Sequence, residues 1–435
     1  MKKSRIKNSC LAFLFILLSC SANNKGEENT PAEKMNIEGT FIQSWLCGSW
    51  SDAQWDAEFK ALKEAGMKYL IMAPMLQTDE EGDKSSVYPS SWNPSAPDVL
   101  ETLLRSAKRN DFKVFLGINM NERWWRLNYD DKWLYEQMEE GNKVIDEILA
   151  KYKSRYEETL YGWYWVWEVD NLNCNTSECR TILANCLNIN LDHLSKVCPD
   201  MPLMLSPFMN YRVGVDASGY GQMWKEVFAK AQFRKGDIFA PQDCCGAGGL
   251  TTDMLREWFG ALKAAVDTKK GLLFWTNVEN FEQHSWTSAP MNRYAKQIET
   301  ERPFVSGMIT FAYSHYYSPN TCNGKLHEAY SYYVKEGVLP EIALPEAVSN
   351  VLLKRSGEET HLSWNLPDKR DTFLGVHIYK NGSWYRTVQS DKNGNCSLVF
   401  TETTALNDSD VFEVASFNAV GAESEKVKAN RIVSP

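Results

Sequence analysis

Short apolar segments alternate with longer amphipathic segments from residue 39 to residue 336. The apolar segments lack a strict alternation of apolar and polar residues, which is typical of strands buried on both faces of a parallel sheet. Eight such strands are predicted, at Gly39–Trp45, Tyr69–Met75, Lys113–Asn119, Tyr161–Val169, Pro202–Phe208, Asp237–Gln242, Gly271–Val278 and Ser306–Tyr313.

Helices are predicted between these strands. Ser51 and Gln54 have the spacing of a capping box before the first helix, and Gly66 is a typical stop after it. Ser95 and Asp98 cap the second helix. The predicted helices cover 52–65, a segment that ends at 110, and about 131–157, 177–197, 219–231, 252–268, 291–301 and 325–336.

Eight strand–helix units within about 300 residues predict a (β/α)8 TIM barrel over residues 37–337. A doubly wound open sheet is the alternative α/β fold. The sequence lacks the glycine-rich phosphate loop that would support this alternative. The barrel is therefore the favoured fold, and we expect its functional residues where the strands end.

The pattern changes after residue 337, and residues 338–435 are predicted to hold a linker and a small all-β sandwich. Short strands follow one another, and Asn381-Gly382 is a strong hairpin signal. The segments around Trp364, Val376–Tyr379 and Phe412–Asn418 resemble a fibronectin type III module, a sandwich of the immunoglobulin class. This resemblance implies that Trp364 and Phe412 are core residues. We assign no chemistry to this domain.

The N-terminus has the pattern of an export signal. Four basic residues precede an apolar run that is too short to span a bilayer, and the run ends in Leu17-Leu18-Ser19-Cys20. This ending resembles the lipobox of bacterial lipoproteins, which implies cleavage after residue 19 and lipidation of Cys20. Residues 20–36 then form a flexible tether. The alternative is an ordinary secretory signal with an incidental cysteine.

Composition adds two constraints. The net charge is −9, and it becomes −13 without the basic first 19 residues, which argues against a nucleic-acid partner. The chain contains 16 Trp, 19 Tyr and 19 Phe, more rings than one core requires. Rings in this number suit a site that stacks on the flat faces of sugars.

Nine cysteines remain after Cys10 and Cys20 are set aside, and in an exported protein they are disulfide candidates. Cys174 and Cys179 are spaced for a local bridge. A zinc site is the alternative, but no Cys-x2-Cys pair is present. We expect neither a metal nor a cofactor.

Residues at the predicted strand ends are mainly carboxylates, amides and aromatic rings. Glu168 closes the fourth strand and Glu279 the seventh, so both point toward one mouth of a closed barrel. The candidate substrate-binding residues are Trp45, Asn119, Trp124, Trp167, Asp170, Asn171, Asn210, Gln242, Asp243, Trp275, Asn277, Tyr313 and His315.

Two carboxyl groups that flank a bond are what glycosidic cleavage requires, one protonated and one ionised. Neighbouring tryptophans would desolvate one carboxylate and raise its pKa. The simpler interpretation of either glutamate alone is a salt bridge at the barrel rim. Asp170, Asp243 and Glu282 are the substitutes if the strand register differs by two residues.

A glutamate after strand four and another after strand seven resemble the clan-A glycoside hydrolases, which are retaining enzymes. Residues 37–336 are also similar to a glycoside-hydrolase-like barrel family of lipoproteins of unknown function, around 162–168 and Trp275-x-Asn277-x-Glu279. The resemblance implies that Glu168 is the acid/base and Glu279 the nucleophile. Trp167 departs from clan A, which has an asparagine before the strand-four glutamate. Asn119 or Asn171 would have to replace it.

The sequence therefore predicts an exported glycoside hydrolase that is lipid-anchored to the bacterial outer membrane and acts on an oligo- or polysaccharide. An inverting hydrolase would use the same two residues at a greater separation. The hypothesis from a different class is a non-catalytic glycan-binding or scaffold lipoprotein that kept the barrel without the reaction.

Overall fold

The structure is a computed structural model, and it describes residues 36–126, 130–356, 359–402, 407 and 409–432. The predicted signal peptide, the lipidation site Cys20 and the tether up to residue 35 lie outside the described residues. No helix within the described ranges is long and apolar enough to cross a membrane.

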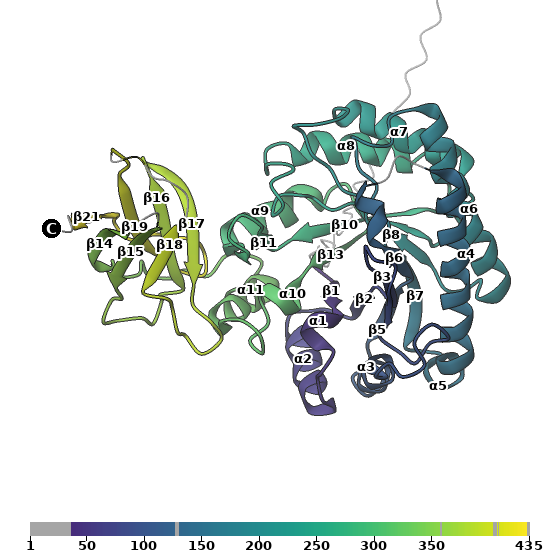
Figure 1. The fold of residues 1–435 in the computed structure, drawn as a ribbon, viewed down its shortest axis with the longest axis horizontal. Coiled ribbons are helices and arrows are strands. Elements are labelled where there is room, and N and C mark those ends of the chain that lie inside the picture. The colour runs from purple at the N-terminus through teal and green to yellow at the C-terminus, as the bar shows by residue number, and fades with distance from the viewer. Residues whose placement is uncertain (1–35, 127–129, 357–358, 403–406, 408, 433–435) are drawn as a thin grey trace, which may run out of the picture. The chain divides into compact units, whose positions relative to one another are not determined.

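Eight parallel strands close into a barrel, in the order β1-β13-β10-β9-β8-β7-β5-β2 (Figure 1). This confirms the predicted (β/α)8 fold. The barrel strands are β1 (Gly39–Gln43), β2 (Tyr69–Ala73), β5 (Lys113–Gly117), β7 (Leu160–Trp165), β8 (Leu203–Leu205), β9 (Ile238–Phe239), β10 (Leu273–Glu279) and β13 (Gly307–Phe311).

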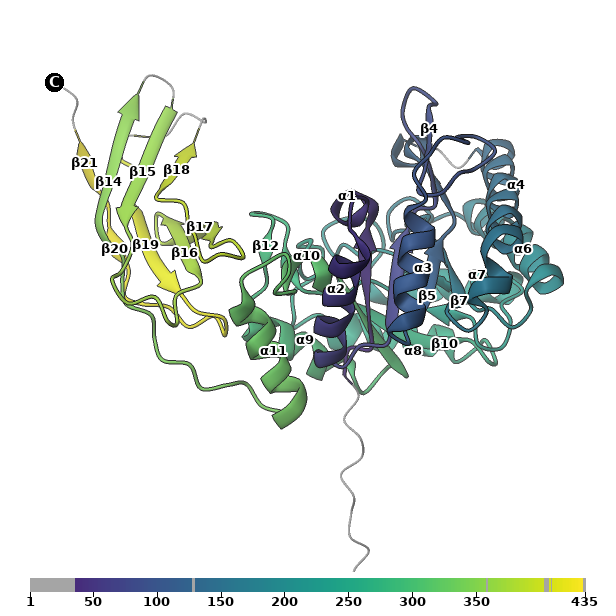
Figure 2. The same cartoon turned by 90° about the horizontal axis from the view of Figure 1, so that it is seen from below.

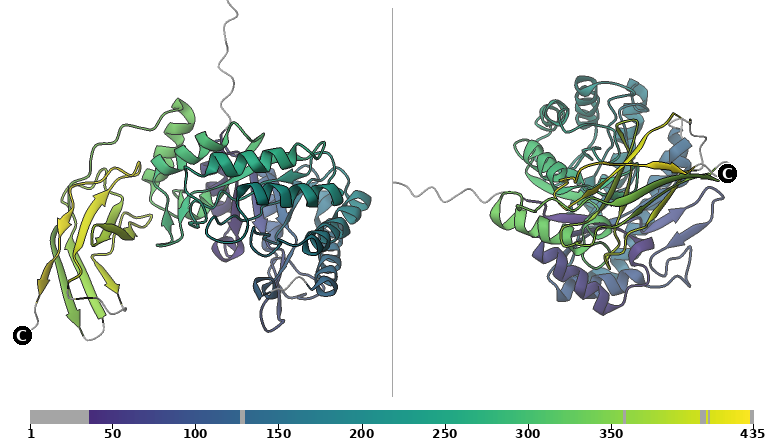
Figure 3. Two further views of the ribbon diagram at one scale, coloured as in Figure 1. Left: turned by 90° about the horizontal axis from the view of Figure 1, so that it is seen from above. Right: turned by 90° about the vertical axis from the view of Figure 1, so that its left-hand side faces the viewer.

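Helices surround these strands in each view (Figures 1 and 3). Ser51 and Gln54 form the predicted capping box, and Asp98 caps the following helix through the Glu101 N–H. The outer helices are α2 (Asp52–Glu64), α3 (Val99–Arg109), α4 (Asp131–Ile148), α6 (Ser177–Val197), α7 (Ala217–Lys230), α8 (Leu255–Val266), α9 (Met291–Glu301) and α11 (Gly324–Glu336).

Short elements decorate the barrel and were not predicted as separate elements. A three-stranded sheet has the order β4-β3-β6, and β11 pairs with β12 in a hairpin. These elements are α1 (Ser44–Cys47), β3 (Leu76–Thr78), β4 (Lys84–Ser86), β6 (Asn119–Asn121), a 3-10 helix (Glu122–Arg126), a π-helix (Leu149–Lys153), α5 (Ser154–Tyr156), β11 (Phe281–Glu282), β12 (Thr287–Ser288) and α10 (Tyr313–Tyr316).

The barrel has two separate apolar layers. One layer lies between strands and helices, and a smaller cluster fills the barrel interior. In the interior, Trp275 on β10 lies against Gly307 on β13, where a Cβ would come within 2.5 Å of the indole. The barrel is thus closed below its mouth, and a ligand site is confined to the carboxyl ends of the strands.

Residues from 349 onward form two four-stranded sheets, of order β18-β15-β14-β21 and β17-β16-β19-β20, which are layered in Figure 2. Trp364 and Phe412 lie in the core between them. The strands are β14 (Ser349–Ser356), β15 (Glu359–Asn365), β16 (Gly375–Lys380), β17 (Ser383–Gln389), β18 (Val399–Glu402), β19 (Phe412–Phe417), β20 (Val427–Lys428) and β21 (Asn430–Ile432). The predicted sandwich is confirmed, and its likeness to fibronectin type III stays a prediction.

Eight of the described cysteines do not form the disulfides expected from the cysteine content. Eight cysteines of the described region are free thiols, namely Cys47, Cys179, Cys186, Cys198, Cys244, Cys245, Cys322 and Cys396. Because Cys179 is free, its local bridge to Cys174 is absent. Most of these thiols are buried and belong to the core, where a cysteine packs as a small apolar residue.

Candidate active site

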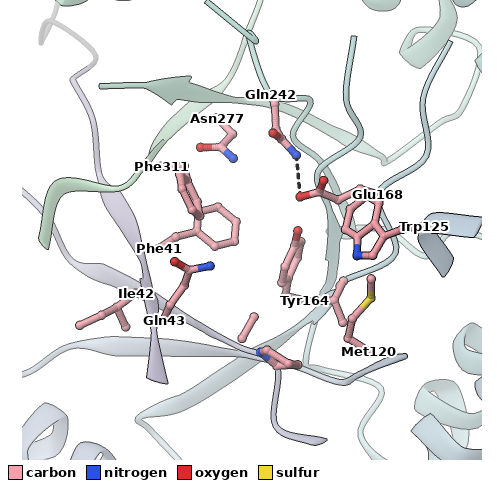
Figure 4. A pocket seen from close by; sticks show the side chains of 13 residues that line it. Phe41, Ile42, Gln43, Met120, Trp125, Tyr164, Glu168, Gln242, Asn277 and Phe311 are labelled. Carbon is pink, nitrogen blue, oxygen red and sulfur yellow. Dashed lines mark hydrogen bonds between the residues drawn. The ribbon is translucent and has the colours of Figure 1, made fainter. Parts of the chain in front are cut away.

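A pocket opens at the carboxyl ends of the barrel strands (Figure 4). Among the described residues that line it, Glu168 is the only one with a charged side chain. Aromatic rings and three amides, from Gln43, Gln242 and Asn277, supply much of the remaining wall. The lining residues are Phe41, Ile42, Gln43, Ala73, Pro74, Met120, Trp125, Tyr164, Val166, Glu168, Gln242, Asn277 and Phe311.

Strand β7 and the segment after it carry Glu168 into this pocket. Alternate residues face opposite sides of an extended segment, so Tyr164, Val166 and Glu168 all face the barrel axis. Trp167 faces the other way and packs edge-on against Trp124, with ring centroids 5.6 Å apart. The Trp124 indole N–H also donates to the Glu168 carbonyl at 3.1 Å. The tryptophans thus fix the backbone that presents Glu168.

The Glu168 carboxyl group is held by one neutral donor. Gln242 Nε2 donates to Glu168 Oε1 at 3.1 Å, and the same amide donates to the Ser206 carbonyl at 3.1 Å. Burial raises the pKa of Glu168 to about 7, although the hydrogen bond from Gln242 lowers it. A carboxyl with this pKa holds a proton in about half of the molecules at neutral pH, which suits a general acid.

Backbone pairing places Gln242 and Asn277 side by side. Residues 241–243 run alongside β10, with an isolated bridge between Gln242 and Asn277. Asn277 Nδ2 donates to Ser206 Oγ at 3.1 Å, and its buried Oδ1 accepts no hydrogen bond from the protein. The pocket lining thus contains the neighbouring side-chain amides of Gln242 and Asn277, and amides suit hydrogen bonds with ligand hydroxyls.

Glu279 lies at the end of β10 but is not among the residues that line the pocket. Its side chain is 1% exposed and is covered by the loop after β9, where the Ala247 N–H donates to Glu279 Oε2 at 2.7 Å. Burial and the nearby Asp243 raise the pKa of Glu279 to about 8, against the lowering effect of the Ala247 hydrogen bond. Protonation of Glu279 is therefore favoured at neutral pH.

Asp243 and Glu301 lie behind Glu279 and are fully buried. Asp243 accepts hydrogen bonds from the Glu279 N–H at 3.2 Å and from the Gln297 amide, and Glu301 accepts one from the Thr276 hydroxyl. Burial raises the pKa of both groups, and the nearby Asp243 also disfavours ionisation of Glu279 and Glu301. This cluster favours a shared proton rather than three charges.

The structure places most of the other predicted polar residues outside the pocket lining. Asn171 donates to the carbonyls of Asn210, Val213 and Val215, and its Oδ1 accepts from the Asn210 N–H, so it braces a loop. Asn119 donates to the Gln137 carbonyl at 3.0 Å. Asp170 accepts from the backbone of the next turn. Neither asparagine therefore stands in the position expected of a clan-A replacement for Trp167.

Predicted aromatic residues are also distributed among different environments. Trp275 belongs to the closed interior, and Tyr313 is buried with its hydroxyl 2.8 Å from His327 Nδ1. His315 accepts from the Gln43 N–H at 3.1 Å, and burial lowers its pKa to about 4. Trp45 is 73% exposed and its indole N–H donates to the Gln43 amide oxygen at 2.9 Å.

Of the predicted site residues, the pocket thus brings together Glu168, Gln242 and Asn277. Sequence reasoning did not select Tyr164, Phe41 and Phe311 as site residues, although they line the same pocket. The available signal was alternation, because Tyr164 lies four residues before Glu168 on the same side of the strand. Within the described residues, no group of three or more His, Cys, Asp or Glu side chains is arranged to hold a metal ion.

A solved structure shares this fold. A protein from Bacteroides thetaiotaomicron VPI-5482, named as a candidate α-L-fucosidase, is similar with a TM-score of 0.53 and 21% identity over 69% of this chain and 93% of that chain. An endo-1,4-β-mannanase from Rhizomucor miehei has a TM-score of 0.45 and 14% identity over 64% and 86% of the two chains. At these identities the likeness concerns the fold alone.

A search of curated proteins found no match to this sequence. A family model described as a domain of unknown function, DUF4434, matches residues 37–323. This match covers the barrel up to the start of its last helix, including every residue that lines the pocket. The chain therefore belongs to the DUF4434 family.

Proposed function

We propose that this protein is a glycoside hydrolase in which Glu168 donates a proton to the leaving oxygen of a glycosidic bond. The observation that carries the proposal is a half-buried carboxyl group at the wall of an open pocket, whose pKa is raised to about 7 by partial removal from water. Enzymes that cleave glycosidic bonds need such a proton donor, and burial is the usual way to keep a carboxyl protonated near neutral pH.

The remaining lining supports a sugar as the ligand. The amides of Gln43, Gln242 and Asn277 supply donors and acceptors for hydroxyl groups, and Phe41 and Phe311 offer apolar ring surface. In Figure 4 the rings of Phe41 and Phe311 lie across the pocket from Trp125 and Glu168. A pyranose ring has hydroxyl groups along its edge, which can bond to the amides, and an apolar face, which can pack on the aromatic rings.

Glu279 is the proposed second carboxylate, in the role of nucleophile. Its place at the carboxyl end of the barrel strand β10 supports this role, because catalytic residues of this fold lie at the strand ends. Attack on a sugar would require the loop of residues 244–249 to move away from the Glu279 side chain. This movement would also expose the Glu279 carboxyl group to solvent, which would favour its ionisation.

A second candidate function is glycan binding without catalysis. The observation in its favour is the burial of Glu279, which leaves Glu168 as the only carboxyl group among the described residues that line the pocket. In this case the pocket would hold a sugar through its amides and rings, and no bond would be cleaved.

Release of reducing sugar from a panel of neutral polysaccharides, including mannan, xylan and β-glucan, tests the proposal. We expect release by the full chain and no release by Glu168→Gln. Glu226→Gln on α7 is the matched control, because its carboxyl pairs with Arg180 on the outer surface. Glycan binding by both proteins with no cleavage by either would establish the second candidate function and overturn the first.

Export and lipid anchoring through Cys20 to the bacterial outer membrane are also proposed, on the sequence pattern alone. Incorporation of labelled palmitate in a bacterial host tests the anchor. The label should appear in the full chain and be lost in Cys20→Ser, and a chain that stays unlabelled would exclude lipidation.

A further inference from the structure

The hairpin of β11 and β12 carries an exposed tryptophan in a strained backbone conformation. Trp286 is 63% exposed and has a φ of 50°. This left-handed region is open to glycine and tolerated by asparagine, but a bulky side chain is rarely found there. Local backbone preference alone would favour glycine or asparagine at this turn, so the tryptophan stands against that preference.

The Trp286 ring is the outermost of three nearly parallel rings. It stacks on Phe281 with an interplanar angle of 7° and a centroid distance of 6.0 Å. Phe281 in turn stacks on Tyr316 at 22° and 5.4 Å. The two inner rings support one face of the indole and hold it in place. A preformed ring surface of this kind loses little side-chain entropy when a ligand binds.

This stack continues directly into the pocket. Phe281 contacts Phe311 edge to face at 5.8 Å, and Phe311 lines the pocket. Ser288 on β12 also donates to the Tyr316 carbonyl at 2.5 Å, which ties the hairpin to α10 at the barrel mouth. Phe311 and Trp286 both contact the buried ring of Phe281, so the exposed indole lies two ring contacts away from the pocket lining.

We propose that Trp286 is a binding platform for a second sugar ring of a neutral glycan whose neighbouring unit occupies the pocket. This inference rests on the proposed function. An uncharged sugar is favoured because none of the described residues that line the pocket carries a positive charge, so an acidic sugar would find no cation to pair with. The flat indole face suits the apolar face of a sugar ring.

Isothermal titration of the non-cleaving Glu168→Gln protein with manno-, xylo- and cello-oligosaccharides of one to six units tests this platform. Affinity should rise with length beyond one unit. Adding Trp286→Asn should lower the affinity for two to six units by about 3- to 10-fold and leave the affinity for the single sugar unchanged, as expected for loss of one ring contact. Trp286→Phe should restore part of the affinity.

Thermal unfolding separates this role from a structural one. Asparagine tolerates the left-handed backbone, so the Trp286→Asn protein should melt at the same temperature as its parent or higher. Tyr332→Ala on α11 is the matched control for loss of an exposed ring, and it should change no affinity.

An affinity that is independent of length, or equal before and after Trp286→Asn, would overturn the platform but leave the proposed function in place. Binding of no oligosaccharide and no parent polysaccharide by the Glu168→Gln protein would overturn both.

Discussion

The ends of β7 and β10 present the same residue type in two different settings. Glu168 and Glu279 both follow an apolar strand, and burial raises the pKa of both. Glu168 receives a single side-chain hydrogen bond and lines the open pocket. Glu279 receives a backbone hydrogen bond from the neighbouring loop, lies beside Asp243 and is almost fully enclosed.

The difference between these two carboxyl groups comes from the loops and not from the strands. After β9, the loop of residues 244–249 closes over the end of β10, and Gly246 allows its backbone to approach Glu279 Oε2. After β7, the chain stays extended and leaves Glu168 open to the pocket. A barrel therefore sets where a carboxyl group lies, whereas the following loop sets which molecules reach it.

The sharpest test of this comparison is kinetic. Glu168→Gln should lower kcat/KM by about 10³-fold for a substrate with a sugar leaving group, because proton donation contributes on this scale. The loss should be small for a dinitrophenyl glycoside, whose leaving group needs no proton. Glu279→Gln should lower kcat/KM for both substrates if Glu279 is the nucleophile. A Glu279→Gln enzyme of normal activity would remove Glu279 from the mechanism.

The enclosure of Glu279 is tested at Gly246. A Cβ at this position would lie 2.4 Å from the Phe281 carbonyl oxygen and 3.0 Å from Glu279 Oε2. Gly246→Ala should therefore lower the free energy of unfolding by about 1–3 kcal/mol, measured by urea denaturation.

Gly260→Ala in α8 is the matched control for this substitution. The nearest atom to its Cβ would be 3.7 Å away, on Phe304. Because alanine favours a helix interior, this variant should gain about 0.5–1 kcal/mol. A neutral effect of Gly246→Ala would show that the loop is not tightly packed on Glu279.

The raised pKa of Glu279 predicts a specific dependence of stability on pH. The folded state keeps the proton up to about pH 8, whereas the unfolded state loses it near the ordinary value of 4.5. Stability contributed by this group is thus present at low pH and is lost as the pH rises between these values. Glu279→Gln should flatten this loss between pH 5 and 8.

Urea denaturation at several pH values measures this slope, with Glu226→Gln as the control. The Glu226 carboxyl is exposed, and its pKa is lowered by the hydrogen bond from Arg180, so its removal should not change the slope above pH 5. Parallel curves for Glu279→Gln and the parent would contradict the raised pKa.

The smallest expected effect concerns Gln242. Its amide donates to Glu168 and lowers the pKa of that carboxyl, so Gln242→Leu should raise the pKa. If Glu168 is the general acid, the alkaline limb of the kcat/KM profile should move up by about 0.5–1 pH unit, the value of one net hydrogen bond. An unmoved alkaline limb in a folded variant would assign that limb to another group.

Much of the fold was predictable because it is encoded locally. Apolar runs marked the barrel strands, and the Ser51–Gln54 capping box formed as its spacing indicated. In the sandwich, Asn381 and Gly382 adopt the positive φ values of 52° and 79° that the turn requires. The predicted strand at Asp237–Gln242 is shorter in the structure, β9, in part because Pro241 has no N–H to donate to the ladder.

The site was less predictable because its selection depends on tertiary contacts. Asn171 and Asn277 both follow or belong to barrel strands, and nothing in the sequence separates the amide that braces a loop from the one that lines the pocket. The cover over Glu279 is likewise a contact between residues 32 positions apart, with no local signal. The residue types at the strand ends identified the candidate site residues, whereas tertiary packing determines which of their side chains line the pocket.

The closed barrel interior has a consequence for turnover. Because Trp275 lies against Gly307 beneath the pocket, a ligand cannot pass through the barrel, and it must enter and leave at the barrel mouth. If the protein cleaves glycans as proposed, the product would leave through the same opening by which the next substrate enters. A product that dissociates slowly would therefore act as a competitive inhibitor.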